Sequence, residues 1–302
     1  VTNKAAAEMR HRIESVLSDG NQRLFGMWVG TFHSIAHRLL RAHHLDADLP
    51  QDFQILDSED QLRLLKRLMK LHHFDEKSFP PKQAAWYINN KKDEGLRPNQ
   101  IDDHHDRQER EWIRIYQIYQ DACDRAGLVD FAELLIRAYE LFAKKPVILQ
   151  SYQQRFQHIL VDEFQDTNKI QYAWIKILAG NTGKVMIVGD DDQSIYGWRG
   201  AQVENIQKFL KDFNAKTIRL EQNYRSTGNI LKSANQLISN NSDRLGKNLW
   251  TDGEMGEPVG IYAAFNELDE AKFVASQIQN WVDDDGKLDD CAVLYRSNSQ
   301  SR

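Results

Sequence analysis

The strongest constraint on the fold of this chain is a short apolar run that ends in two acidic residues. Ile159, Leu160 and Val161 directly precede Asp162 and Glu163. An apolar run of this length is typical of a strand buried in a parallel sheet. Ligands of open α/β sheets bind beyond the carboxyl ends of such strands, where two carboxylates can hold a magnesium ion and orient a water against a phosphate. Taken alone, the pair could also simply cap the following helix.

A second apolar run ends in the same way. Residues 185–188 are apolar, and three aspartates follow at 190–192. These carboxylates could bind a metal or lie in a solvated turn. Glycines on both sides of the Trp198-Arg199 pair favour an exposed loop over a core position. An aromatic ring beside an arginine suits single-stranded DNA, because bases stack on the ring and phosphates pair with the cation.

Three further junctions carry polar or aromatic residues where an element begins or ends. Tyr224 and Arg225 follow a strand predicted at 217–220, and offer a flat face for a base and a cation for a phosphate. The segments Thr31-Phe32-His33 and Thr2-Asn3 begin predicted helices. Exposed amide groups at helix N-termini favour phosphate, although simple capping explains either segment as well.

Strands and helices alternate over most of the chain, which predicts an α/β fold with a parallel, doubly wound sheet. We predict strands at 25–32, 159–162, 185–190, 217–220, 258–264 and 291–295. Between about residues 40 and 150, strand-like runs are absent and amphipathic helices are expected at 61–71, 83–92, 109–126 and 131–142. Asp57 and Asp130 precede two of these helices as expected caps. This stretch therefore reads as a helical insertion.

The composition narrows the class of protein. The 302 residues are enough for two domains, and 41% of them are hydrophobic. A net charge of −5 excludes a uniformly basic nucleic-acid binder but not a local basic groove. Two distant cysteines indicate neither a disulfide framework nor a cysteine-based zinc site. Without a membrane-spanning run or signal peptide, the expected location is the cytoplasm, with no membrane partner.

In combination, these junctions resemble the ordered motifs of a known family. The matching segments are Thr-Asn-Lys-Ala-Ala-Ala-Glu-Met (2–9), Thr-Phe-His (31–33), Gly-Leu-Val-Asp-Phe (127–131), Val-Asp-Glu-Phe-Gln-Asp-Thr (161–167), Gly-Asp-Asp-Asp-Gln-Ser-Ile-Tyr-Gly-Trp-Arg-Gly (189–200), Gln-Asn-Tyr-Arg-Ser (222–226) and Leu-Tyr-Arg-Ser-Asn (294–298). Together they resemble the UvrD/Rep/PcrA family of superfamily 1 DNA helicases, and they extend over essentially the whole chain.

The resemblance implies a RecA-like sheet of the P-loop NTPase fold. Residues 1–38 and 151–221 would form the first RecA-like domain, 39–150 its helical insertion, and 222–302 the beginning of a second RecA-like domain. The implied ligands are ATP and Mg²⁺, bound between two such domains.

The resemblance also assigns catalytic roles. Asp162 would hold magnesium, and Glu163 would position or activate the hydrolytic water. Gln193 would sense the terminal phosphate. From the second domain, Tyr224 would stack on adenine and Arg225 would reach the γ-phosphate as an arginine finger.

The family moves 3′ to 5′ on single-stranded DNA and acts in DNA repair and replication. The partners implied are single-stranded DNA, junctions of single and double strands, and DNA repair proteins, while the oligomeric state stays open. Residues implied to line the DNA track are Thr2, Asn3, Thr31, Phe32, His33, Phe131, Tyr196, Trp198, Arg199, Arg296 and Asn298.

One departure from the family is large. The phosphate loop Gly-x-x-x-x-Gly-Lys-Ser/Thr belongs upstream of Thr2, and Gly183-Lys184 has the wrong spacing to replace it. We therefore expect this chain to be a piece of a longer helicase that hydrolyses little or no ATP alone. The alternative is a non-motor protein that binds single-stranded DNA or a partner on the same scaffold. A carboxylate-based nuclease is a more distant alternative, since it would need further acidic ligands.

Overall fold

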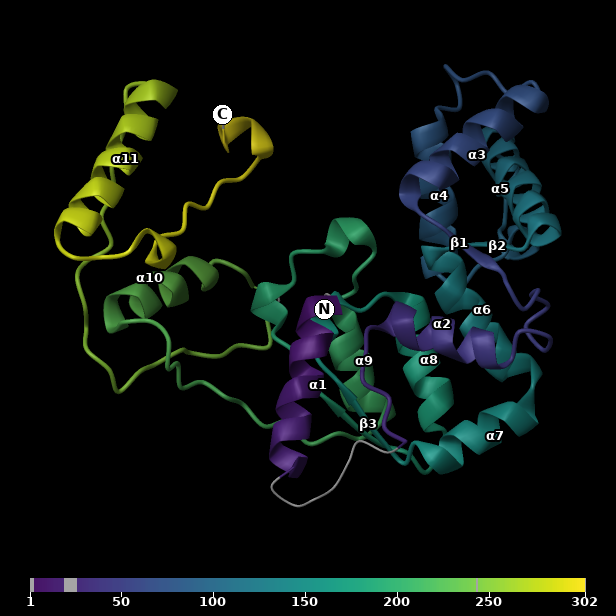
Figure 1. Ribbon diagram of the computed structural model, residues 1–302, viewed down its shortest axis with the longest axis horizontal. Helices are drawn as coiled ribbons and strands as arrows, with labels where there is room; N and C mark the ends of the chain where they lie inside the picture. Colours follow the sequence, from purple (N-terminus) through teal and green to yellow (C-terminus); the bar gives the residue numbers. More distant parts are fainter. Residues whose placement is uncertain (1–2, 19–25, 243, 302) are drawn as a thin grey trace. The chain divides into compact units, whose positions relative to one another are not determined.

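The computed structural model describes residues 3–18, 26–242 and 244–301. The chain divides into two compact units, Val1–Ile218 and Arg219–Arg302 (Figure 1). Both contain helices; among the described residues the paired strands lie in the first unit, and the second has an isolated bridge between Gln222 and Trp250. Each unit is described by itself below.

The first unit contains most of the regular structure. Its helices are α1 (Asn3–Ser18), α2 (Phe32–Ala42), α3 (Ser58–Leu71), α4 (Pro81–Asp93), α5 (Arg107–Ala126), α6 (Phe131–Lys144), α7 (Pro146–Arg155), α8 (Lys169–Ala179) and α9 (Glu204–Asp212). Its strands are β1 (Gln54–Leu56), β2 (Leu128–Asp130), β3 (His158–Val161) and β4 (Lys184–Ile187). The second unit contributes α10 (Gly228–Ile238) and α11 (Glu267–Asp283). The helices predicted from apolar periodicity are confirmed, whereas α7 was not predicted.

The two strands predicted around the acidic junctions form a parallel pair. In β3 and β4, His158 lies opposite Lys184 and Val161 lies opposite Ile187. A second parallel pair joins Gln54–Leu56 to Leu128–Asp130. The expectation that the stretch from 40 to 150 lacks strands is therefore wrong. Each of these strands is three residues long, which is too short for an apolar pattern to identify.

Four other predicted strands are not formed. Residues 26–31 are turn and coil before α2, and the segments 217–220, 258–264 and 291–295 contain no strand. Their apolar side chains are largely exposed: Leu220 is 83%, Ile261 96% and Leu294 94% accessible. A strand requires a neighbour that accepts and donates backbone hydrogen bonds, and an apolar run alone does not supply one.

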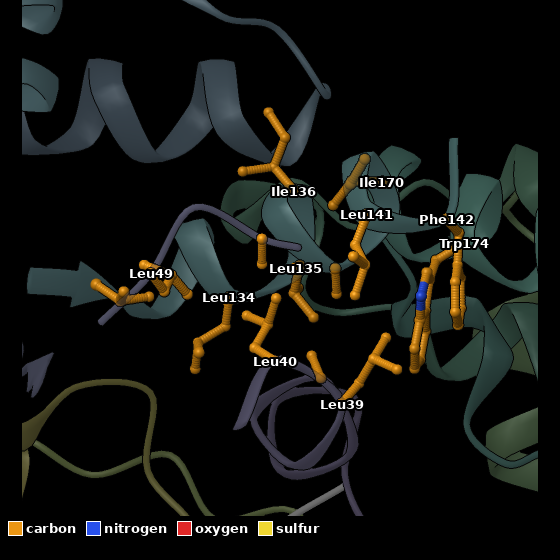
Figure 2. Close-up of a cluster of buried hydrophobic side chains, with 14 of the residues drawn as sticks. Leu39, Leu40, Leu49, Leu134, Leu135, Ile136, Leu141, Phe142, Ile170 and Trp174 are labelled. Atoms are coloured by element: carbon orange, nitrogen blue, oxygen red, sulfur yellow. The ribbon is translucent and has the colours of Figure 1, made fainter. Parts of the chain in front are cut away.

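The main core lies between helices of the first unit. Leu39 and Leu40 of α2 face Leu134 and Leu135 of α6 (Figure 2), and all four are at most 3% exposed. In the same cluster, Phe142 of α6 stacks on Trp174 of α8 with 6.3 Å between the ring centres. This packing joins the ends of the predicted helical insertion to the helix that follows the Asp162-Glu163 junction.

Two smaller clusters complete the interior of this unit. One lies within α3, α4 and α5, and is centred on Leu65, Ile88 and Tyr119. The other packs Val161 and Phe164 against Ile206 and Phe209 of α9, beside the β3–β4 pair. Among the described residues, no helix combines the length and the apolar character needed to cross a membrane.

Candidate functional site

The carboxyl ends of β3 and β4 bring the two acidic junctions together. The amide of Val188 donates to the carbonyl oxygen of Val161 at 2.8 Å, and the amide of Phe164 donates to Val188 at 3.0 Å. Asp162 and Asp190 therefore follow neighbouring strand ends of a parallel pair. This edge of a parallel sheet is where ligands of α/β proteins bind.

The Asp162-Glu163 pair is exposed and its backbone is constrained. Glu163 has a φ of +51°, in the left-handed region that residues other than glycine seldom adopt. Its amide donates to Asp162 Oδ1 at 3.0 Å. Its carboxylate Oε2 accepts a 2.7 Å hydrogen bond from Nε2 of Gln165. Both carboxylates thus face solvent at the strand edge, and that of Glu163 has a fixed neighbour.

Gln165 joins the two junctions, although no feature of the sequence distinguished it. Its side chain is 1% exposed. Its Oε1 accepts a 3.0 Å hydrogen bond from the amide of Asp190, while its Nε2 donates to Glu163. A Cβ at Gly189 would lie 2.9 Å from Gln165 Oε1, so glycine permits the close approach of these segments.

The segment after β4 turns back on its own carboxylate. Asp190 Oδ1 accepts from the amide of Asp192 at 3.1 Å, and Oδ2 accepts from Nε2 of Gln193 at 2.6 Å. The three aspartates at 190–192 could present ligand atoms within 4.8 Å of one another. Both carboxylate oxygens of Asp190 thus accept hydrogen bonds from within the turn, as those of a capping residue do.

Behind the junction lies a buried polar layer. Asn205 of α9 is 1% exposed, and its Nδ2 donates to the carbonyl oxygens of Thr167 and Asn168. Within the described residues, the buried Asp166 Oδ1 has no hydrogen-bond partner. Burial raises the pKa of Asp166, and the charge of Glu163 adds to this rise. Buried backbone carbonyl groups and the side-chain amide of Asn205 therefore lie behind the junction.

The side chain of Asp93 joins the helical insertion to this layer. Asp93, at the end of α4, accepts a 2.8 Å hydrogen bond from Nδ2 of Asn168, the N-cap of α8. Burial raises the pKa of Asp93 to about 7, and the nearby carboxylate of Asp130 contributes to that rise. A titratable group thus lies between the insertion and the strand-end junction.

Several residues predicted to touch DNA cluster at the start of α2. Thr31 caps the helix by accepting from the amide of Ser34. Phe32 packs edge-on against Trp174 at 6.0 Å, so part of its role is in the core. His33 meets Phe131 edge-on at 6.0 Å between ring centres, although 98 positions separate them in sequence. Burial lowers the pKa of His33, which favours the neutral imidazole at pH 7.

The glycine-flanked loop is exposed, as the sequence predicted. Tyr196 is 36% and Trp198 70% accessible. The loop ends where the amide of Gln202 donates to the carbonyl oxygen of Thr167 at 2.9 Å. Thr2 and the side chains of Asn3 and Arg199 lie outside what the structure describes.

The remaining candidates lie in the second unit. Tyr224 is 87% exposed, and its hydroxyl donates to Gln222 Oε1 at 2.8 Å. The backbone amide of Arg225 donates to Asn223 Oδ1, and Arg225 itself is exposed. The amide of Arg296 donates to Gln300 Oε1, and Asn298 begins a short 3₁₀ helix.

The donors at the strand edge fit a magnesium ion. Asp162 offers an exposed carboxylate, and Glu163 lies beside it. Mg²⁺ in nucleotide sites is held by one or two carboxylates, with phosphate oxygens and waters completing its shell. The carboxylates at this edge therefore offer the oxygen ligands that Mg²⁺ prefers.

Comparison with known families covers nearly the whole chain. The family model described as the UvrD/REP helicase N-terminal domain matches residues 1–214, and that of the UvrD-like helicase C-terminal domain matches residues 218–302. The boundary between the two matches falls beside the division of the structure after Ile218.

Similar proteins are named as DNA helicases. The chain is 85% identical over 302 residues to DNA helicase II of Haemophilus influenzae and 70% identical to DNA helicase II of Escherichia coli, covering 42% of each relative. It is 42% identical over 306 residues to the ATP-dependent DNA helicase PcrA of Staphylococcus aureus, covering 41% of it. All of this chain takes part in each match, so it spans about two fifths of the length of these relatives.

Proposed function

The chain belongs to the UvrD/REP helicase family, and on this premise we propose that it is part of an ATP-dependent helicase that moves 3′ to 5′ on single-stranded DNA. Its proposed role is in DNA repair and replication. The observation that carries the proposal is the hydrogen-bonded meeting of the Asp162-Glu163 and Asp190–Gln193 junctions at one edge of the β3–β4 pair. Such an edge suits a nucleotide phosphate and its metal.

The proposed architecture is RecA-like. Residues 1–38 and 151–221 belong to the first RecA-like domain, and residues 39–150 form its helical insertion. Residues 222–302 begin the second RecA-like domain. The parallel β3–β4 pair and the helical character of the insertion support this division.

The proposed ATP chemistry gives each catalytic candidate a role. Asp162 would hold Mg²⁺, which would offset the negative charge of the phosphates. Glu163 orients and deprotonates the attacking water, and its fixed carboxylate supports this role. Gln193 contacts the terminal phosphate. Tyr224 stacks on the adenine, and Arg225 stabilises the charge that develops on the transferred phosphoryl group.

The proposed DNA track runs along the aromatic residues. His33 and Phe131 form one contact point and the loop of Tyr196 and Trp198 another, where exposed rings accept stacked bases. Thr2, Asn3, Thr31, Phe32, Arg199, Arg296 and Asn298 complete the proposed set. The proposed partners are single-stranded DNA, its junctions with duplex, and DNA repair proteins.

The activity is proposed for a protein of the relatives' length. The relatives are more than twice as long as this chain, and the 302 residues contain no Gly-x-x-x-x-Gly-Lys-Ser/Thr loop. Without its amide cradle and lysine, binding of a triphosphate is weak. The 302-residue chain alone is therefore expected to hydrolyse little or no ATP.

The proposal is tested with the full-length protein. We expect ATP hydrolysis that single-stranded DNA stimulates, and strand separation of a partial duplex that carries a 3′ tail but not of one that carries a 5′ tail. Unwinding from the 5′ tail alone would overturn the proposed polarity. Absence of both DNA-stimulated hydrolysis and unwinding would overturn the proposed function.

A second candidate is a non-motor protein that binds single-stranded DNA. The exposed rings of Tyr196 and Trp198 would serve this candidate as well, because bases stack on them without any nucleotide bound. The two candidates differ in their response to nucleotide. A helicase binds a fluorescent ATP analogue and changes its DNA affinity when it does so, whereas the alternative binds DNA with the same affinity at any ATP concentration.

A further inference from the structure

Gln165 is a buried glutamine whose two amide ends face two different junctions. Its side chain is 1% exposed. Nε2 donates to the carboxylate of Glu163 at 2.7 Å, and Oε1 accepts from the backbone amide of Asp190 at 3.0 Å. A buried amide with both ends bonded is held in a single orientation.

This orientation matters because Glu163 is otherwise exposed. An exposed glutamate has three rotatable side-chain bonds, and its carboxylate samples several positions. A donor fixed at 2.7 Å from Oε2 restricts the carboxylate to the side of Gln165. A misplacement of about 1 Å in a catalytic group can cost about 100-fold in rate. The orientation of Glu163 is thus set by a residue that touches no substrate.

The same amide connects Glu163 to the segment after β4. Asp190 receives the side-chain amide of Gln193 on Oδ2 at 2.6 Å, and its own amide donates to Gln165. Glu163, Gln165, Asp190 and Gln193 therefore form one continuous hydrogen-bonded chain. A shift of the 190–193 segment would be transmitted to the carboxylate through two bonds of Gln165.

We propose that Gln165 is a positioning residue that fixes the Glu163 carboxylate against the Asp190 backbone, so that its orientation follows the state of the 190–193 segment. This inference rests on the proposed ATPase function and adds to it a residue that acts only through Glu163. A purely structural role of Gln165 would need only its Oε1, which accepts the hydrogen bond from the amide of Asp190. The functional role belongs to Nε2 of Gln165, which donates to the Glu163 carboxylate.

Two substitutions in the full-length protein distinguish the hydrogen bond made by Oε1 of Gln165 from the one made by its Nε2. Gln165→Glu keeps an acceptor for the Asp190 amide but removes the donor to Glu163, and Gln165→Leu removes both. We expect kcat for DNA-stimulated ATP hydrolysis to fall about 10- to 100-fold in each, with KM for ATP changed less than about threefold. The stimulation by single-stranded DNA is expected to shrink in the same proportion.

Gln61→Met is a matched control, because Gln61 is a 4% exposed amide that bonds Asn89 within the helical insertion. It is expected to lower the melting temperature and leave kcat unchanged. Unchanged kcat in Gln165→Glu would overturn the inference, as would a fall in melting temperature that matches Gln61→Met and accounts for the lost turnover. If the unsubstituted protein hydrolyses no ATP with DNA, the proposed function fails first, and this outcome is distinct from any change between variants.

Discussion

Charged residues are used in opposite ways in the helical insertion and at the strand-end junction. In the insertion, Lys92 is 1% exposed and lies 2.7 Å from Asp130 and 2.9 Å from Glu133. At the junction, Asp162 and Glu163 are exposed, and no described cation forms an ion pair with either. Buried charges that satisfy one another hold helices together, whereas exposed carboxylates held by amides are available to a ligand.

The electrostatics of the insertion follow from this pairing. Burial alone would raise the pKa of Glu133, but the guanidinium of Arg97 and the ammonium of Lys92 hold it well below its ordinary value. Burial likewise opposes the charge of Lys92, yet Asp130 and Glu133 raise its pKa above the ordinary value. Arg137 completes the network at 2.7 Å from Glu133. The paired charges of this network serve the fold.

The largest expected effect is loss of a buried charge. Lys92→Met leaves Asp130 without its cation, and removal of one partner from a buried pair costs about 3–5 kcal/mol. We expect a lower melting temperature and faster hydrogen exchange in α4, α5 and α6. Lys176→Met is the control, since its pair with Asp212 is exposed and contributes at most about 1 kcal/mol. Equal losses in the two variants would contradict the contrast between the regions.

The opposite result is expected at the junction. Glu163→Gln should lower kcat for ATP hydrolysis in the full-length protein by about 10²- to 10³-fold, or roughly 3–4 kcal/mol, because the general base is removed. The melting temperature should stay within about 1 °C of the unsubstituted protein. Glu204→Gln, exposed on α9, is the matched control and should change neither quantity. A Glu163→Gln protein with full turnover would remove Glu163 from the chemistry.

Asp93 lies between the two regions and gives a pH-dependent prediction. Its pKa is about 7 in the folded chain against an ordinary 3.8, so folding takes up a proton between these values. Stability contributed at this position is therefore greatest below about pH 4 and is lost as pH rises toward 7.

In Asp93→Asn the side chain cannot ionise, so stability is not lost as pH rises, and its oxygen still accepts a hydrogen bond from Asn168. We expect the variant to be more stable by about 2–4 kcal/mol at pH 8 and nearly unchanged at pH 4. Chemical denaturation at both pH values checks this. A gain of equal size at pH 4 and pH 8 would show that the carboxyl group does not titrate in this range.

The smallest expected effect compares two exposed tryptophans. Trp198→Ala should weaken binding of single-stranded DNA by about 1–3 kcal/mol, the contribution of one stacked base. Trp86→Ala on α4 removes a ring of similar exposure, 64% against 70%, and should leave that affinity unchanged. Fluorescence anisotropy with an oligothymidine measures both. Equal effects would place the proposed DNA track elsewhere.

Local chemistry made much of the first unit predictable. Asp57 and Asp130 accept amide hydrogen bonds at the starts of α3 and α6, as the sequence predicted. The apolar runs before Asp162 and Asp190 do form strands. The runs at 217–220 and 291–295 have a similar composition but no strand partner, so the pattern predicted strands where none form.

The sequence by itself determined helix caps such as Asp57 and Asp130 and the order of the family's motifs, because each depends on neighbours within a few positions. The tertiary structure alone decided that His33 meets Phe131, that Asp130 belongs to a buried ion network, and that Gln165 joins Glu163 to Asp190. The His33–Phe131 contact, the Lys92–Asp130 pair and the bond between Asp190 and Gln165 each join segments far apart in sequence, so they depend on packing that no local pattern encodes. The acidic pair was visible in the sequence, but the amide that holds it in place was not.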